Sequence, residues 1–83
     1  MNERKEMSRV VDVVTSKNGN VFLSTLDKNN KMMFVNLIKD NKKFSPKIPK
    51  SAKSAEVTFT SYLFDDENKR LVLFDVKDIT FMS

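Results

Sequence analysis

Apolar and polar residues alternate with a period of two over most of the chain, and no long stretch follows the 3.6-residue period of a helix. Because side chains of a strand point alternately to its two faces, this alternation is typical of strands with one face in a core. It predicts five strands, at residues 7–15, 20–27, 31–38, 55–64 and 69–82. Residues 1–6 are mostly charged and are predicted to form a flexible tail before a single β domain over residues 7–83.

The segments between these strands predict the turns. Asn18-Gly19 is the strongest short hairpin signal, because a type I′ turn needs positive φ at both central residues. Residues 28–30 and 65–68 are rich in Asn, Asp, Lys and Glu and are predicted to turn the chain again. The apolar residues of the last strand change parity and then return, which indicates a β-bulge or a bend.

Residues 39–53 do not follow the alternation. Pro46 and Pro49 each lack a backbone N–H and push the preceding residue toward extended geometry. A regular strand or a long helix is therefore not expected in this segment, although a single helical turn near residues 50–55 is compatible with it.

Five short strands with one long connection between the third and the fourth predict an all-β fold, a small five-stranded Greek-key barrel of the OB type. An SH3-like or Sm-like barrel is the main alternative. A chain of 83 residues buries about 60–65% of its unfolded surface, which gives marginal stability. We therefore expect a homodimer.

Composition argues against an enzyme. The chain contains no Cys and no His, so disulfides, thiolate metal sites and the commonest general base are excluded. The carboxylates are scattered, and the acidic run Asp65-Asp66-Glu67 lacks the spacing and the glycine of a calcium loop, so it is predicted to be a solvated turn. We expect no catalytic residue, no cofactor and no metal. Since no apolar run approaches the ~18 residues of a membrane span, we expect a cytoplasmic protein without a membrane partner.

Positive charge is concentrated in residues 39–53, which we call the basic segment. It holds six of the fifteen Lys and Arg residues and one of the eleven acids, Asp40. The rest of the chain is therefore almost neutral. A local basic patch is typical of proteins that bind phosphate backbones or other anions. The alternatives are a solvated loop that keeps the protein soluble and a loop that docks on an acidic protein.

The aromatic residues, seven Phe and Tyr62, add a second signal. The cleaner apolar stripes are predicted to face the core, and they comprise Val21, Leu23, Met33, Val35, Leu37, Val57, Phe59 and Leu63. This leaves Phe22, Phe34 and Tyr62 toward the outside on neighbouring strands, where bases could stack on them. Phe44 lies within the basic segment and is either an anchor for that loop or a stacking residue.

The first predicted hairpin, T-S-K-N-G-N-V-F at residues 15–22, resembles that of the filamentous-phage single-stranded DNA-binding proteins, the gene V protein class. In that family a Ser and a basic residue precede a Gly, and an aromatic follows three residues after it. Here these are Ser16, Lys17, Gly19 and Phe22. The chain differs in having Val21 where family members often have Pro and Phe22 where they often have Tyr.

The resemblance implies an OB-fold dimer, of phage or bacterial origin, that coats single-stranded DNA without sequence preference. In this chain Lys17 would then meet phosphate and Phe22 would stack on a base.

Charge, aromatics and resemblance together predict a non-sequence-specific binder of single-stranded nucleic acid, with DNA favoured over RNA. The alternative is a small protein-binding module or inhibitor that docks its basic loop on an acidic protein surface. The predicted nucleic-acid-binding residues are Lys17, Phe22, Phe34, Lys39, Lys42, Lys43, Phe44, Lys47, Lys50, Lys53 and Tyr62.

Overall fold

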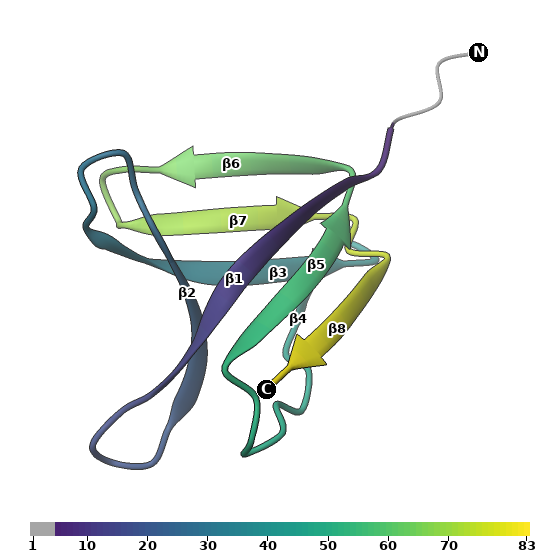
Figure 1. Cartoon of the computed structure of the whole chain (residues 1–83). Helices are drawn as coiled ribbons and strands as arrows, with labels where there is room; N and C mark the ends of the chain where they lie inside the picture. Colours follow the sequence, from purple (N-terminus) through teal and green to yellow (C-terminus); the bar gives the residue numbers. More distant parts are fainter. Residues whose placement is uncertain (1–4) are drawn as a thin grey trace.

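The computed structural model describes residues 5–83 and is all-β (Figure 1). Residues 1–4, most of the predicted tail, lie outside the described part. The eight strands are β1 (Met7–Thr15), β2 (Val21–Leu26), β3 (Met32–Lys39), β4 (Lys42–Phe44), β5 (Ser54–Phe59), β6 (Ser61–Asp65), β7 (Arg70–Phe74) and β8 (Asp78–Met82). No helix occurs within residues 5–83, and accordingly none there is long and apolar enough to cross a membrane.

The strands form one open mixed sheet in the order β6-β7-β3-β2-β1-β5-β8, with β4 paired to β3 outside this path. All neighbours are antiparallel except β3 and β7, which are parallel. Figure 1 shows β6, β7 and β3 as one layer and β1, β5 and β8 as a second layer that crosses it, while β2 passes from one to the other. The core lies between the two layers.

The predicted alternation places the core correctly in β3 and β5. In β2, Leu23 is buried as predicted, but Val21 is half-buried and Ser24, of the opposite parity, is buried. Met33, Val35 and Leu37 are buried on one face of β3, and Phe34 is exposed on the other. The central cluster also takes apolar residues from β1, β5 and β7: it comprises Val11, Leu23, Val35, Leu37, Ala55, Val57, Phe59, Leu71, Leu73 and Val76. These residues follow period two because each strand has one face in the core.

The first hairpin turn is not type I′, as the sequence predicted. Gly19 has positive φ (84°), but Asn18 does not. The Gly19 N–H donates to the Ser16 carbonyl oxygen at 3.0 Å, and the Ser16 N–H donates to the Asn20 carbonyl oxygen at 2.8 Å. This pattern is that of a three-residue loop, a turn closed by one left-handed residue that forms a bulge. Because its φ is positive, position 19 still favours glycine in this turn type.

A short strand inside the basic segment also contradicts the sequence prediction. β4 pairs with β3 through Asp40 and Asn41, which both have positive φ (53° and 61°). Asp and Asn tolerate the left-handed region better than other residues with a Cβ, so this dipeptide supplies the two-residue turn expected at Asn18-Gly19. The prolines follow β4 and do not interrupt it. The helical turn considered near residues 50–55 does not form: the chain makes one hydrogen-bonded turn at residues 49–52, where the Ala52 N–H donates to the Pro49 carbonyl oxygen at 3.1 Å, and β5 begins at Ser54.

The last two predicted strands are each divided. Thr60 separates β5 from β6, and the parity break predicted in the last strand is confirmed between β7 and β8, where Asp75 has φ 52°. The Thr60 hydroxyl donates to an Asp75 carboxylate oxygen at 3.0 Å, which links the two breaks. Leu63 was predicted to be in the core and is 54% exposed, because the break at Thr60 reverses the facing of the residues that follow it.

Candidate nucleic-acid interface

Two phenylalanine rings lie side by side on the outer face of the sheet. Phe22 of β2 and Phe34 of β3 have ring centroids 5.3 Å apart at an interplanar angle of 56°. The register pairs Ser24 with Phe34, so Phe22 is the diagonal neighbour of Phe34, and diagonal neighbours are within reach of aromatic rings. Phe22 is half-buried and Phe34 is 44% exposed. The pair therefore presents a tilted apolar surface to solvent.

This ring pair forms one wall of a groove of about 530 Å³, which we call the outer groove. The other residues lining it are Leu23, Val35, Asn36, Ile38, Lys43, Leu63, Asp65, Asn68, Arg70 and Val72. A smaller hollow of about 290 Å³ shares Phe22 and Lys43 with the outer groove and extends to Phe44 and Pro46 of the basic segment. Apolar side chains thus form much of the surface, while cations approach it from two sides.

Lys43 reaches the outer groove because of the β3–β4 pairing. It lies opposite Ile38, on the face of β3 that also carries Phe34 and Asn36. Residues of the other parity, Lys42 and Phe44, lie opposite Lys39 and Leu37 on the other face. The pairing of β4 with β3 therefore determines that Lys43, and not Lys42, lies on the same face as Phe34.

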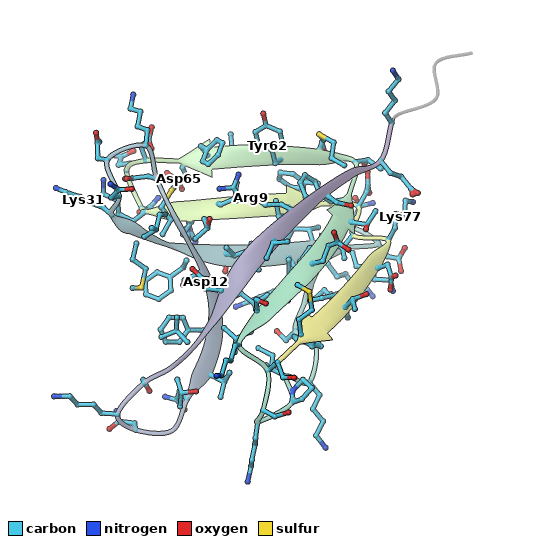
Figure 2. All side chains as sticks on the ribbon, viewed as in Figure 1. Arg9, Asp12, Lys31, Tyr62, Asp65 and Lys77 are labelled. Carbon is cyan, nitrogen blue, oxygen red and sulfur yellow. The ribbon has the colours of Figure 1, made fainter. Side chains whose placement is uncertain are left out.

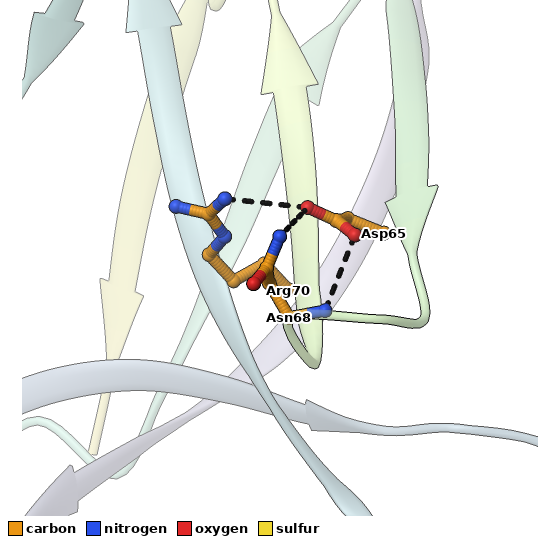
Figure 3. A network of polar contacts seen from close by, with 3 residues as sticks. All are labelled: Asp65, Asn68 and Arg70. Atoms are coloured by element: carbon orange, nitrogen blue, oxygen red, sulfur yellow. Dashed lines mark hydrogen bonds and ion pairs between the residues drawn. The ribbon is translucent and has the colours of Figure 1, made fainter.

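Arg70 lines the outer groove from the start of β7, where Asp65 holds it and Asn68 in turn holds Asp65 (Figure 3). One Asp65 carboxylate oxygen accepts hydrogen bonds from Arg70 Nη2 at 3.2 Å and from Asn68 Nδ2 at 2.9 Å. The other accepts the backbone N–H of Asn68 at 3.2 Å. The Asn68 side chain, the Asn68 N–H and Arg70 together lower the pKa of Asp65 from its ordinary value. A charged Asp65 therefore orients the Arg70 guanidinium beside the groove.

The remaining predicted lysines lie outside the outer groove and the adjoining hollow. Each is exposed, and none belongs to the lining of either: Lys17 in the first hairpin turn, Lys39 on β3, Lys42 on β4, and Lys47, Lys50 and Lys53 in the loop that follows. These lysines supply positive charge around the groove but do not line it.

Phe44 packs against the core as a half-buried side chain. Lys39 Nζ lies 5.2 Å from the centroid of its ring, at a distance typical of a cation–π contact. These contacts favour the role of an anchor that fixes β4 to the sheet, and they leave one edge of Phe44 in the smaller hollow.

Tyr62 lies away from the Phe22–Phe34 pair. It is 51% exposed, is paired with the buried Leu73, and makes edge contacts with Phe59 and Phe64 at centroid distances of 6.3 Å and 5.5 Å. Figure 2 labels it on β6. The structure therefore brings Phe22, Phe34 and Lys43 together and separates Tyr62 from them.

Sequence reasoning missed Asn36 and Arg70 as groove residues. Asn36 shares the parity of Phe34, so the alternation itself places it on the outer face. Arg70 shares the parity of Val72 and pairs with Asp65 across the hairpin. Asp65 and Arg70 are opposite charges at the two ends of the predicted turn, and this pair could have indicated the position of Arg70 from the sequence.

A metal site has no support in the described residues, since no group of three or more acidic side chains within residues 5–83 could hold an ion. Comparisons with protein-family models, curated proteins and solved structures found no match to this chain. The function is therefore inferred from the geometry of the groove.

Proposed function

We propose that this protein binds single-stranded nucleic acid, with DNA favoured, along the outer groove and without sequence preference. The observation that carries this proposal is the Phe22–Phe34 pair flanked by Lys43 and Arg70. Each base stacked on an aromatic ring contributes about 1–3 kcal/mol and every base has a stacking face, so such a surface tolerates any sequence. Nearby lysines of the basic segment would add phosphate contacts.

The proposal includes an OB-type barrel. In support, β1, β2 and β3 follow one another as antiparallel neighbours, β1 also pairs with β5, and β3 pairs in parallel with β7. β5 and β6 would then be two halves of one bent strand, and β7 and β8 two halves of another, which together with β1, β2 and β3 gives five strands as in the gene V protein class and leaves the short β4 as an addition. Ser16, Lys17, Gly19 and Phe22, which carry that resemblance, lie on the first hairpin.

We also propose that the functional unit is a homodimer. Within the described residues, large apolar side chains are exposed on five strands, β1, β2, β3, β6 and β8, among them Val10, Met32 and Met82, and a domain of this size gains stability by covering such surface. Light scattering coupled to gel filtration should give twice the monomer mass of 9.6 kDa. A monomer mass at all concentrations would remove this part of the proposal and leave the groove unaffected.

A salt titration tests nucleic-acid binding. If four phosphates are neutralised, the logarithm of the affinity for labelled poly-dT should fall with the logarithm of salt concentration with a slope of about −3. Fluorescence anisotropy measures this directly. The absence of binding at about 50 mM salt, where counterion release favours the complex, would refute the proposal.

A protein-binding module is the second candidate, favoured by the position of Lys47, Lys50 and Lys53 outside the groove. If these lysines dock on an acidic protein, changing all three to Ala should abolish capture of that protein while binding of poly-dT stays weak in every variant. If the nucleic-acid proposal is correct, changing Lys43 to Ala should weaken poly-dT binding more than changing Lys77, an exposed lysine of another face.

A further inference from the structure

A second cavity lies where the sheet is open between β1 and β6, and it borders the same β6–β7 hairpin as the outer groove. Within the described residues β6 pairs with β7 alone, and residues 7–11 of β1 pair with β5 alone. The cavity has a volume of about 600 Å³ and is lined by Arg9, Leu26, Asp27, Lys28, Asn29, Phe64, Asp66 and Lys69. We call it the seam cavity. Its volume is in the range of small-molecule sites.

Arg9 is the central polar group of the seam cavity. Its Nη2 donates to the Thr25 hydroxyl at 3.0 Å, and its guanidinium carbon lies 6.0 Å from the centroid of the Phe64 ring. Arg9 Nε is buried and has no hydrogen-bond partner among the described residues. Because Nε is closed to solvent, a ligand in the cavity would meet Arg9 at the end of its guanidinium group. Figure 2 shows Arg9 near Tyr62, with which it lines a smaller adjoining hollow.

The walls of the seam cavity are apolar and its rim is cationic. Leu26 is 52% exposed and Phe64 is 44% exposed, so both present apolar surface to the opening. Lys28 and Lys69 add positive charge to that of Arg9. Two acids also line the cavity: Asp27 uses one carboxylate oxygen to accept the N–H groups of Asn29 and Lys31 within its own turn, and Asp66 lies in the β6–β7 turn with Lys69, so three cations and two acids leave a net charge of +1.

We propose that the seam cavity binds one nucleoside monophosphate unit. The base lies against Phe64 and Leu26, and the phosphate accepts hydrogen bonds from Arg9 and meets the charges of Lys28 and Lys69. A ring and an anion in one ligand match an apolar wall and a cationic rim, whereas inorganic phosphate or an uncharged nucleoside matches only half of the site. The unit comes either from a free nucleotide or from the 5′-phosphorylated end of a strand. This site is separate from the outer groove, so either proposal can fail without the other.

The test is a titration of the ¹⁵N-labelled full chain with dTMP, followed by backbone amide shifts. Saturable shifts at residues 26–29, 64–69 and Arg9 are expected, with thymidine and inorganic phosphate each binding at least about tenfold more weakly. Two further ligands, 5′-phosphorylated and 5′-hydroxyl dT₄, distinguish a free nucleotide from the end of a DNA strand. Their binding is compared in the Phe22→Leu/Phe34→Leu variant. Tighter binding of the phosphorylated form indicates a strand end, and equal binding of the two indicates a free nucleotide.

Variants locate the site. Lys28→Ala/Lys69→Ala removes two exposed charges and should weaken dTMP binding about fivefold or more, while Lys5→Ala/Lys77→Ala removes the same charge from exposed residues outside the cavity lining and should leave it unchanged. Phe64→Leu keeps an apolar side chain and should weaken binding about fivefold or more through lost stacking. The proposal is overturned by the absence of saturation at about 10 mM dTMP, by equal shifts with phosphate alone, or by equal losses in the two lysine double variants.

Discussion

The two rings of the outer groove lie together beside two cations, Lys43 and Arg70. Changing Phe22 to Leu keeps an apolar residue in β2 but removes the stacking face, so affinity for single-stranded DNA should fall about fivefold to a hundredfold. The salt slope should stay unchanged, because no phosphate contact is lost. Anisotropy at several salt concentrations measures both quantities.

The matched control is Tyr62→Leu, which removes an exposed aromatic on β6 outside the groove. Equal losses of affinity in the two variants would show that the Phe22–Phe34 pair is not the binding surface.

Asp65 contributes stability that depends on pH. Hydrogen bonds from Asn68, then from Arg70, lower its pKa in the folded state. A carboxyl group with a lowered folded pKa stabilises the protein fully above its unfolded pKa of about 3.9, and this contribution is lost as pH falls through the folded pKa. Asp65→Asn should therefore lower Tm at pH 7, and the difference from the unmodified protein should narrow below about pH 4.

Thermal unfolding followed by circular dichroism over this pH range checks the effect. Asp66→Asn is the control, because it removes a charge from the same turn without touching the hydrogen bonds of Asp65. A gap between Asp65→Asn and the unmodified protein that is constant from pH 7 to pH 3 would contradict the assignment.

At the scale of the elements, the break at Thr60 decides which side of β6 faces the core. Leu73→Ala removes a fully buried side chain of β7 and should lower the free energy of unfolding by about 2–5 kcal/mol. Leu63→Ala, in the neighbouring strand, should cost less than about 1 kcal/mol because Leu63 is exposed. Urea denaturation measures both, and similar costs for the two variants would mean that β6 faces the other way.

The sequence predicted the five extended segments, and the core faces of β3 and β5, because alternation depends on local geometry. Residues 7–15 match β1 in full, and the buried stripe of β3 was predicted residue by residue. The sequence did not predict β4. Lys42 and Lys43 carry no apolar pattern, and the turn at Asp40-Asn41 lacks glycine.

The candidate site was predictable in part for the same reason. Parity put Phe22 and Phe34 on the outside, but whether Tyr62 joined them depended on the break at Thr60, which only tertiary hydrogen bonds define. Arg9 gave no signal, since its environment is made by β2 and β6, which are distant in sequence.

At the scale of the whole molecule, the basic segment and the ring pair meet at one place. Lys43 lines both the outer groove and the smaller hollow, which continues to Phe44 and Pro46. Positive charge from the segment therefore lies next to the apolar surface on which bases would stack. Charge alone attracts any polyanion, and it is the adjoining rings that make a single strand the ligand we propose.

The most direct test of the proposed function is to find which residues a bound DNA strand contacts. An amide-shift map of the ¹⁵N-labelled protein with a dT oligonucleotide at low salt should show its largest changes at Phe22, Phe34, Asn36, Lys43 and Arg70, with smaller changes over residues 45–53. Shifts confined to residues 45–53, or no saturable shift at all, would contradict the central claim that the outer groove binds single-stranded nucleic acid.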